Sequence, residues 1–429
     1  MIEMVKKAKE ASIKMSALNT DIKNAALKKI AQALNDNKDR IFSANSKDLT
    51  EAEKLVATGE ITQSTYNRLK LDENKFRDMV MGILDVAKLE DPVNKILLKR
   101  ELDENLILEK ISCPIGVIGV IFEARPDVIS QISSLAIKSG NVVILKGGKE
   151  AKETNTAIFE VIREALNSII GFPKNVINLI YSRYEVSELL KMDKYVDLII
   201  PRGGNALVKY IKENTKIPVL GHADGICHIF IDKSADKNMA ERICLDAKTQ
   251  YPSACNSVET ILVHKEYPYL KELLNILKEN DVKIIGDNIC QRMRPDIILA
   301  TDEDWIKEYG EKTVSIKILN DIEEAIDHIN IYGSHHTDAI ITNDKNNANK
   351  FTAYVDSAGV YINASTRFAD GFRYGFGAEV GISTNKTHAR GPVGLDGLTI
   401  YKYKIIGSGQ IVDDYVKGIK SFTHKNITR

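Results

Sequence analysis

The residue with the most specific chemistry is Cys255, in the polar loop 252–257 (PSACNS). A helix is predicted over 237–249 and a strand over 258–263, and Pro252 ends the helix, so the thiol lies on a loop between them. A thiol among small polar residues is accessible and can ionise, and the thiolate is the nucleophilic form of cysteine. The residues alone leave two interpretations open: a catalytic nucleophile or an incidental loop cysteine.

The other four of the five cysteines indicate packing rather than chemistry. They lie in or beside apolar segments, where cysteine behaves as a small hydrophobe. No two of the five lie within four residues of each other, so no CxxC pair exists for zinc or redox chemistry, and the odd count favours reduced thiols. The eight histidines show no HExxH or similar spacing, so no metal site is predicted. The four packing cysteines are Cys113, Cys227, Cys244 and Cys290.

Two glycine pairs follow predicted strands, at the carboxyl ends where parallel α/β sheets bind ligands. Neither matches a strict GxGxxG or GxxxxGK[ST] motif, and each could be a plain strand-to-helix turn. Glycine lets a phosphate or ribose approach the backbone, a helix N-terminus attracts anions, and basic side chains stand beside both pairs. The candidate cofactor-binding residues are Lys146, Gly147, Gly148, Lys149, Arg202, Gly203 and Gly204.

Four arginines lie in loop-like stretches rich in Gly, Pro and Ser. They are Arg125, Arg367, Arg373 and Arg390. Each could be a solvated surface residue, but as a group they are candidates for binding an anionic substrate bidentately.

The charge balance excludes other classes of protein. Lys plus Arg and Asp plus Glu each number 59, so the chain lacks the basic excess of a nucleic-acid binder. No apolar run approaches the roughly 20 residues that span a membrane. The first twenty residues carry four lysines and no apolar core, so no signal peptide is predicted. We expect a cytoplasmic protein without nucleic-acid or membrane partners.

The elements that must position these residues form an α/β pattern. From residue 115 onward, uninterrupted apolar runs alternate with helical segments, as expected for parallel strands covered by helices on both faces. The runs form two series, so two α/β domains are predicted, with a boundary near 220–230. The first series is 115–122, 142–146, 176–180 and 196–200; the second is 228–231, 258–263, 282–285, 297–300, 314–318, 339–342 and 360–363.

Other segments depart from this alternation. Residues 1–92 show helical spacing of apolar side chains. Residues 95–112 form two strand-like runs around a polar turn, which predicts a β-hairpin of the kind that pairs with another chain. Residues 371–397 contain seven glycines and predict structured loops, and 399–406 alternates like an edge strand.

Seven segments in order resemble the γ-glutamyl phosphate reductase family, part of the aldehyde dehydrogenase superfamily. They span about 113 to 398, and together they are far more specific than any one of them. The segments are 116–126 (GVIGVIFEARP), 145–151 (LKGGKEA), 200–204 (IPRGG), 221–225 (GHADG), 252–257 (PSACNS), 378–384 (AEVGIST) and 388–395 (HARGPVGL).

The resemblance implies an aldehyde-dehydrogenase-like fold, with two doubly wound α/β domains and a β-hairpin oligomerisation arm. A dinucleotide-binding domain with an N-terminal helical layer is expected over 1–94 and 113–224. A catalytic domain that carries the cysteine is expected over 225–397. The arm and the C-terminal segment are expected over 95–112 and 398–429, and the subunit is expected to form a homo-oligomer.

The resemblance also implies an activity: NADPH-dependent reduction of L-glutamyl 5-phosphate to L-glutamate 5-semialdehyde and phosphate, the second step of proline biosynthesis. Cys255 is then the nucleophile, and its backbone N–H with Asn256 is the expected oxyanion donor set. Lys146 and Lys149 are expected at the adenosine ribose and its 2′-phosphate. The expected substrate-binding residues are Arg125, His222, Asn363, Arg367 and Glu379.

Three departures from the wider superfamily are informative, and one is the glycine-rich turn after the strand 196–200, which is 201–204 (PRGG) here. Oxidising members have an Asn in the turn that is 123–126 here, and its amide helps to hold the oxyanion. They also have a Glu near the position of His222, which activates water to hydrolyse the thioester. The missing Glu fits a reductase that must preserve its thioester.

Two alternative functions and one candidate partner remain. The chain could be another acyl-phosphate or acyl-CoA reductase of the superfamily, or a non-catalytic scaffold partner of a glutamate kinase. Because the chain has no kinase domain, a separate glutamate kinase is the expected source of the acyl phosphate and a candidate partner.

Overall fold

The computed structural model describes residues 1–221 and 224–427, which divide into two compact units. Unit 1 comprises 1–203, 210–220 and the chain from Gly394 onward, and unit 2 comprises 204–209 and 221–393. The predicted assignment of dinucleotide binding to the first and catalysis to the second stays a prediction.

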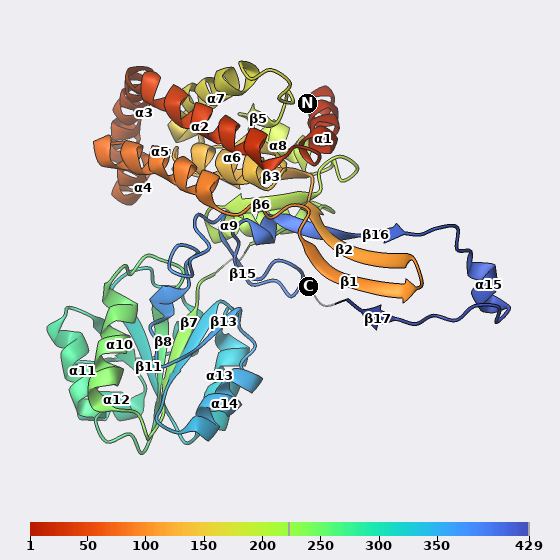
Figure 1. The fold of residues 1–429 in the computed structure, drawn as a ribbon. Helices are drawn as coiled ribbons and strands as arrows, with labels where there is room; N and C mark the ends of the chain where they lie inside the picture. Colours follow the sequence, from red (N-terminus) through yellow and green to blue (C-terminus); the bar gives the residue numbers. More distant parts are fainter. Residues whose placement is uncertain (222–223, 428–429) are drawn as a thin grey trace. The chain divides into compact units, whose positions relative to one another are not determined.

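Unit 1 is built on a four-stranded parallel sheet in the order β5-β4-β3-β6. Helices α2, α3 and α5 form an outer layer that packs on α6 and α7 (Figure 1). Every residue of β3 is buried, as its continuous apolar run predicts. The strands are β3 (Val117–Phe122), β4 (Val142–Lys146), β5 (Ile177–Ile180) and β6 (Leu198–Arg202). The helices are α1 (Ile2–Met15), α2 (Thr20–Asp36), α3 (Lys38–Ala57), α4 (Gln63–Leu69), α5 (Glu73–Lys88), α6 (Val128–Lys138), the 3-10 helix η1 (Lys149–Ala151), α7 (Lys152–Asn167) and α8 (Arg183–Leu189), with α9 (Asn205–Glu213) at the unit boundary.

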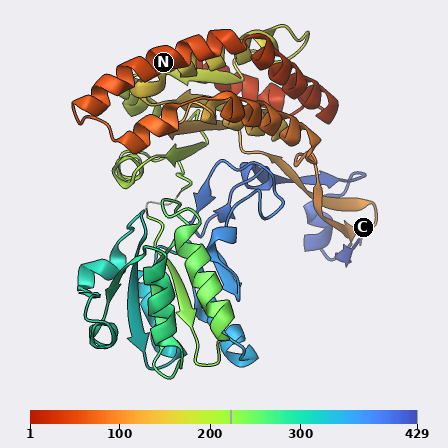
Figure 2. The ribbon, with the colours of Figure 1, turned by 90° about the vertical axis from the view of Figure 1, so that its left-hand side faces the viewer.

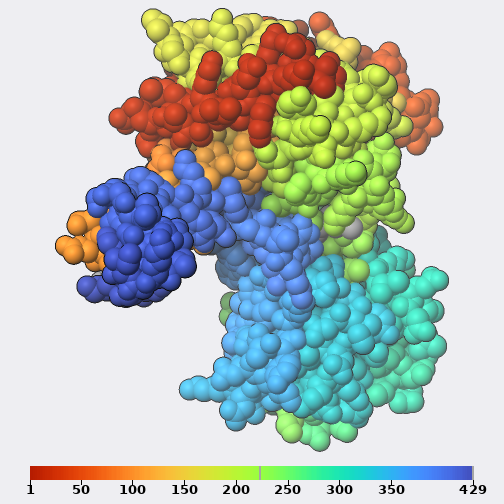
Figure 3. All heavy atoms as spheres, turned by 90° about the vertical axis from the view of Figure 1, so that its right-hand side faces the viewer, coloured from red at the N-terminus to blue at the C-terminus, as the bar shows by residue number. Residues whose placement is uncertain are grey.

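The predicted hairpin is confirmed, and it belongs to a separate antiparallel sheet of unit 1. The sheet has the order β16-β2-β1-β17, so the predicted tail strand lies at one edge, beside the hairpin. Asn105 turns the hairpin with a positive φ of 56°. The space-filling view shows the C-terminal segment packed with the hairpin (Figure 3). The elements are β1 (Ile96–Asp103), β2 (Leu106–Pro114), β16 (Thr399–Ile406), α15 (Val412–Val416) and β17 (Lys425–Asn426).

Unit 2 is a seven-stranded parallel sheet in the order β10-β9-β11-β8-β7-β12-β13, covered on both faces. Helices α10, α11 and α12 lie on one face and α13 and α14 on the other (Figure 1), and the turned view shows the first group in front of the sheet (Figure 2). Each face has its own hydrophobic core. The strands are β7 (Cys227–Ile231), β8 (Val258–His264), β9 (Lys283–Gly286), β10 (Ile298–Leu299), β11 (Thr313–Leu319), β12 (Thr337–Ile341) and β13 (Gly359–Ile362). The helices are α10 (Lys237–Thr249), α11 (Leu270–Glu279), α12 (Asn288–Met293), η2 (Asp302–Ile306), α13 (Ile322–Tyr332) and α14 (Lys345–Tyr354).

The glycine-rich region contains only short elements, as predicted. They are β14 (Ile382–Ser383), β15 (Gly391–Pro392) and η4 (Asp396–Leu398), and the 3-10 helix η3 (Thr366–Phe368) comes just before the region. The predicted fold class is confirmed, because both large sheets are parallel and helix-covered. Within 1–221 and 224–427, no helix is both long and apolar enough to cross a bilayer.

Candidate active site

Cys255 lies on the loop between α10 and β8, at the amino edge of the unit 2 sheet. The first pair of β7 and β8 is Cys227 with Val258, so the loop stands directly beside the start of β7. Cys255 is half-buried, and its carbonyl oxygen accepts a hydrogen bond from the buried Cys227 Sγ at 3.3 Å. Burial raises the pKa of the Cys227 thiol well above its ordinary value, so that thiol stays protonated and donates.

Gly225 explains why the backbone of Cys255 can lie so close to β7. A Cβ added at Gly225 would lie 2.2 Å from the Cys255 carbonyl oxygen and 2.6 Å from its Cα. Both neighbours are backbone atoms and cannot rotate away. The position therefore requires glycine, which lets the loop that carries Cys255 pack closely against it.

Asn256 fastens the loop through its side chain. The residue is buried, and its Nδ2 donates to the carbonyl of Ala369 at 2.8 Å. The backbone N–H groups of Cys255 and Asn256 donate no hydrogen bond to any residue within the described chain. The two adjacent backbone N–H groups are therefore available as donors, whereas the Asn256 side-chain amide already donates to Ala369. The predicted oxyanion donor set stays a prediction.

Arg367 is a buried cation beside this loop. Its side chain lies on η3 with 7% of its surface exposed, and its Nε donates to Gln250 Oε1 at 3.0 Å. Burial, then the neighbouring Arg373, lowers the pKa of Arg367, and a Cys255 thiolate opposes that shift. No carboxylate of the described residues lies within 4 Å of the guanidinium. A buried cation without a carboxylate suits an anionic ligand.

Asn363 lies at the opposite edge of the sheet from Cys255. It follows β13 at the carboxyl edge, where its side-chain amide donates to the Thr342 carbonyl and accepts from the Thr342 N–H, both at 2.9 Å. Its φ of 53° turns the chain back toward the amino edge, where Ala369 meets Asn256. Asn363 therefore shapes the turn that leads to Arg367, and its predicted role in substrate binding stays a prediction.

The two remaining predicted substrate residues of unit 2 differ in outcome. Glu379 accepts a hydrogen bond from the Gly371 N–H at 2.9 Å. Both residues belong to the glycine-rich region 371–397, so this bond stabilises the loop internally. His222 lies outside the described residues. The glycine-rich loop also carries Arg373, whose Nη1 donates to the Arg367 carbonyl at 2.6 Å.

The predicted cofactor residues gather at the carboxyl edge of the unit 1 sheet. Ile121 pairs with Lys146, and Phe122 pairs with Arg202, so the loops after β3, β4 and β6 share this edge. Arg125 lies exposed on the loop after β3. Gly203 and Gly204 are exposed, and a Cβ at Gly204 would meet nothing within 4 Å. The two glycines therefore place no side chain at the β6 turn.

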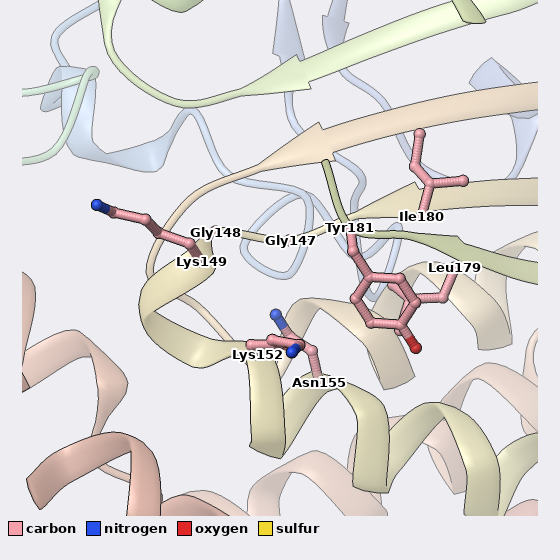
Figure 4. Close-up of a pocket in the computed structure, with 8 residues that line it drawn as sticks. All are labelled: Gly147, Gly148, Lys149, Lys152, Asn155, Leu179, Ile180 and Tyr181. Atoms are coloured by element: carbon pink, nitrogen blue, oxygen red, sulfur yellow. The ribbon is translucent and has the colours of Figure 1, made fainter. Parts of the chain in front are cut away.

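A pocket lies beside the β4 turn (Figure 4). Lys149 is exposed and extends away from the other lining side chains. Lys146 is half-buried at the end of β4, and burial lowers its pKa while Glu150 and Glu123 oppose that shift. The lining residues are Gly147, Gly148, Lys149, Lys152, Asn155, Leu179, Ile180 and Tyr181.

Asn155 is a pocket residue that sequence reasoning missed. It is 2% exposed, and its amide makes no hydrogen bond with the described residues. A Cβ at Gly147 would lie 2.1 Å from Asn155 Nδ2, so Gly147 leaves the space that this amide needs. Buried amides are normally paired, and an unpaired one in a pocket wall suits a ligand hydroxyl or amino group. The only signal in the sequence is a polar residue on an apolar helix face.

The N-terminus of α7 is not open to an anion, which corrects one expectation. Asp48 of α3 accepts from the N–H groups of Glu153 and Thr154 at 3.1 and 2.7 Å. The Asp48 carboxylate therefore occupies the positive end of the helix. The basic groups that remain available near the β4 turn are the predicted Lys146 and Lys149, whose role in phosphate binding stays a prediction.

A metal centre finds no support in the described part of the chain. No group of three His, Cys, Asp or Glu side chains is placed to hold an ion there.

Comparison with known proteins identifies the class. A model of the aldehyde dehydrogenase family matches residues 1–288. The chain is 64% identical to the gamma-glutamyl phosphate reductase of Brachyspira hyodysenteriae, over all of this chain and 99% of that protein. It is 53% identical to that of Acetivibrio thermocellus, over all of this chain and 98% of that protein.

A solved structure agrees with the sequence relatives. The crystal structure of gamma-glutamyl phosphate reductase from Thermotoga maritima superposes with a TM-score of 0.92 at 38% identity, over 96% of this chain and 99% of that one. The chain belongs to the aldehyde dehydrogenase family and, within it, to the family of gamma-glutamyl phosphate reductases. The resemblance drawn from the seven segments is confirmed, and membership implies an oxidoreductase with a nicotinamide cofactor.

Proposed function

We propose that the chain reduces L-glutamyl 5-phosphate to L-glutamate 5-semialdehyde and phosphate with NADPH. The observation that carries the proposal is the surroundings of Cys255. The Cys255 loop carries a half-buried thiol and two adjacent backbone N–H groups that donate to no described residue. A buried arginine without a carboxylate partner, Arg367 of η3, is bonded to Gln250 at the start of that loop. These are the parts that acyl transfer from an anionic acyl phosphate requires.

The proposed chemistry divides one reaction into two steps. The Cys255 thiolate attacks the acyl carbon, the N–H groups of Cys255 and Asn256 donate to the resulting oxyanion, and phosphate departs to leave a thioester. The bound nicotinamide supplies the hydride that reduces the thioester. The same two N–H groups hold the second oxyanion until its collapse expels the thiolate and releases the aldehyde. One such donor contributes about 2.7–4 kcal/mol in comparable enzymes.

The unit 1 residues fit a phosphorylated nucleoside of the cofactor. Asn155 offers an unpaired amide to the ribose hydroxyls, and the glycine pair keeps the β4 turn free of side chains. Lys146 and Lys149 bring positive charge to that turn. Two basic side chains favour a 2′-phosphate, which supports NADPH over NADH.

The lysine at the pocket rim provides a test of cofactor choice. Lys149→Ala should raise the KM for NADPH roughly 10-fold, equivalent to about 1.4 kcal/mol, and leave the KM for NADH within about 2-fold. Steady-state kinetics with both cofactors measures the difference. Lys174→Ala removes another exposed lysine of unit 1 and should change neither KM. Equal increases for the two cofactors would count against the 2′-phosphate role.

We also propose that the sheet β16-β2-β1-β17 joins subunits of a homo-oligomer. Tyr401, Tyr403 and Ile405 form an exposed apolar stripe on one face of the edge strand β16, and Tyr403 is 60% exposed. Stripes of this kind on an edge strand mark protein contacts.

A charge in this stripe should dissociate the assembly. Tyr403→Asp is expected to reduce the molar mass by light scattering to that of a single chain, because an uncompensated charge would be buried in the contact. The control is Ile170→Asp, which changes a fully exposed apolar residue outside the arm and should leave the mass unaltered. An oligomer that survives Tyr403→Asp would refute this interface.

The reverse reaction tests the proposed activity as a whole. Pyrroline-5-carboxylate, the cyclised form of the product, should reduce NADP⁺ only when inorganic phosphate is present. Dependence on CoA in place of phosphate would indicate the acyl-CoA alternative. Absence of turnover with either, in a folded protein that binds a glutamate kinase, would indicate the scaffold alternative.

A further inference from the structure

Unit 2 contains an ion pair that the proposed chemistry does not use. Lys248 and Glu259 are both fully buried, and Lys248 Nζ lies 2.7 Å from Glu259 Oε2. Nζ also donates to the Val258 carbonyl at 2.9 Å. Burial raises the pKa of Glu259 to about 7 and lowers that of Lys248, while their mutual attraction opposes both shifts.

The pair is not explained by stability alone. Taking two charges out of water costs several kcal/mol per ion, and an apolar pair of similar volume is often as stable or more stable. The best-attested benefit of a buried ion pair is that it fixes one arrangement of the elements that carry it. The question is therefore which elements this pair fixes.

The two residues of the pair lie on either side of the loop that carries Cys255. Lys248 is on the last turn of α10, before Cys255, and Glu259 is the second residue of β8, after it. Ser257 Oγ donates to the Ala247 carbonyl at 3.1 Å, so a second contact joins the same two ends. The loop thus spans two ends that the pair holds together.

The last turn of α10 also determines where Arg367 lies. Gln250, the residue that ends α10, accepts the hydrogen bond from Arg367 Nε. A shift of this turn would move the Cys255 loop and the Arg367 guanidinium together. The C-terminal end of α10 therefore determines the positions of both Cys255 and Arg367.

We propose that the buried Lys248–Glu259 pair is a positioning device, which sets the end of α10 against β8 and so fixes Cys255 and Arg367 for reaction. The inference rests on the proposed function, because it takes Cys255 as the nucleophile. Lys248 and Glu259 touch no reacting atom in this account and act through the loop that they close.

The test separates positioning from plain stabilisation. Two variants are compared with the wild type: Lys248→Met alone, and Lys248→Met combined with Glu259→Gln. The measurements are the melting temperature, kcat and the rate at which iodoacetamide alkylates Cys255, with the alkylated peptide identified by mass spectrometry. The control is Lys23→Met, which breaks another buried ion pair, Lys23 with Asp91 at 3.0 Å, in unit 1. Glu259→Gln alone, which keeps the side-chain volume, replaces any variant that fails to fold.

The expected results differ between the two pairs. Lys248→Met lowers the melting temperature, and the double variant recovers much of it because no lone charge stays buried. Both keep kcat at least 10-fold below the wild type, change the alkylation rate of Cys255 and leave the KM for NADPH within 2-fold. Lys23→Met lowers the melting temperature but leaves kcat and alkylation of the folded protein unchanged.

Two results would overturn the inference. One is wild-type kcat and alkylation in the double variant or in Glu259→Gln. The other is an equal loss of kcat in Lys23→Met. Because alkylation needs no substrate, a wild-type Cys255 that is no more reactive than Cys113 would instead count against the proposed function.

Discussion

Replacing Cys255 by alanine should abolish reduction of the acyl phosphate, with kcat falling roughly 10⁴-fold or more. Loss of a covalent nucleophile removes both steps of the proposed reaction, and such losses in other enzymes reach about 10⁶-fold. The half-buried loop position predicts little change in the free energy of unfolding, because few contacts are lost. Binding of NADPH, measured by its fluorescence, should be retained, since the candidate cofactor residues belong to unit 1.

A matched control is Cys113→Ala. Cys113 is also half-buried, but it lies in β2 of the antiparallel sheet, and its substitution should leave kcat unchanged. Turnover of the Cys255 variant within 10-fold of the wild type would exclude thioester catalysis at this residue. Turnover lost in both variants would point instead to a general sensitivity of the fold.

The strands and the hairpin could be predicted because their signals are local. Continuous apolar runs mark strands buried on both faces, and β3, β4, β8 and β11 lie within a residue or two of the predicted bounds. The hairpin 95–112 has its own turn residue, Asn105, whose positive φ is a local property. No long-range contact is needed to recognise these elements.

The site residues could be predicted only in part because their surroundings come from distant segments. The Cys255 loop was recognisable, but the reasons for its shape are Gly225 and Ala369, which lie 30 residues before and 114 residues after it. The N-terminus of α7 looked open because its cap, Asp48, comes from another helix. A sequence pattern shows what a residue offers locally and not which remote group already occupies that place.

Asn363 and Asn155 show two further reasons why the site residues could be predicted only in part. The first was predicted at the site from its place in the sequence, and the second was missed. Asn363 lies close to Arg367 in sequence, yet the two lie toward different edges of the unit 2 sheet, because the chain turns back between them. Asn155 has no motif around it, and only its burial without a hydrogen-bond partner distinguishes it. Satisfaction of hydrogen bonds is a property of the folded chain and is invisible in the residue pattern.

Replacing Arg367 by alanine should lower kcat/KM for the acyl phosphate roughly 30- to 4,000-fold. This factor is equivalent to a loss of about 2–5 kcal/mol in transition-state stabilisation. The reason is that the guanidinium is buried near Cys255 and meets no carboxylate among the described residues. In the proposed reaction the anionic substrate supplies its counter-charge. Arg367→Lys keeps the charge but loses the planar fork, and it should recover only part of the loss. Melting temperatures of both variants establish that the folded protein is being compared.

The reverse reaction then identifies which anionic group Arg367 binds. If it holds the phosphate, Arg367→Ala raises the KM for inorganic phosphate and leaves that for pyrroline-5-carboxylate nearly unchanged; if it holds the substrate carboxylate, the two effects exchange. Arg125→Ala, at the exposed candidate of unit 1, serves as the comparison. An unchanged kcat/KM in Arg367→Ala would mean that this buried cation only supports the loop, through its bond to Gln250 and the carbonyl that accepts from Arg373.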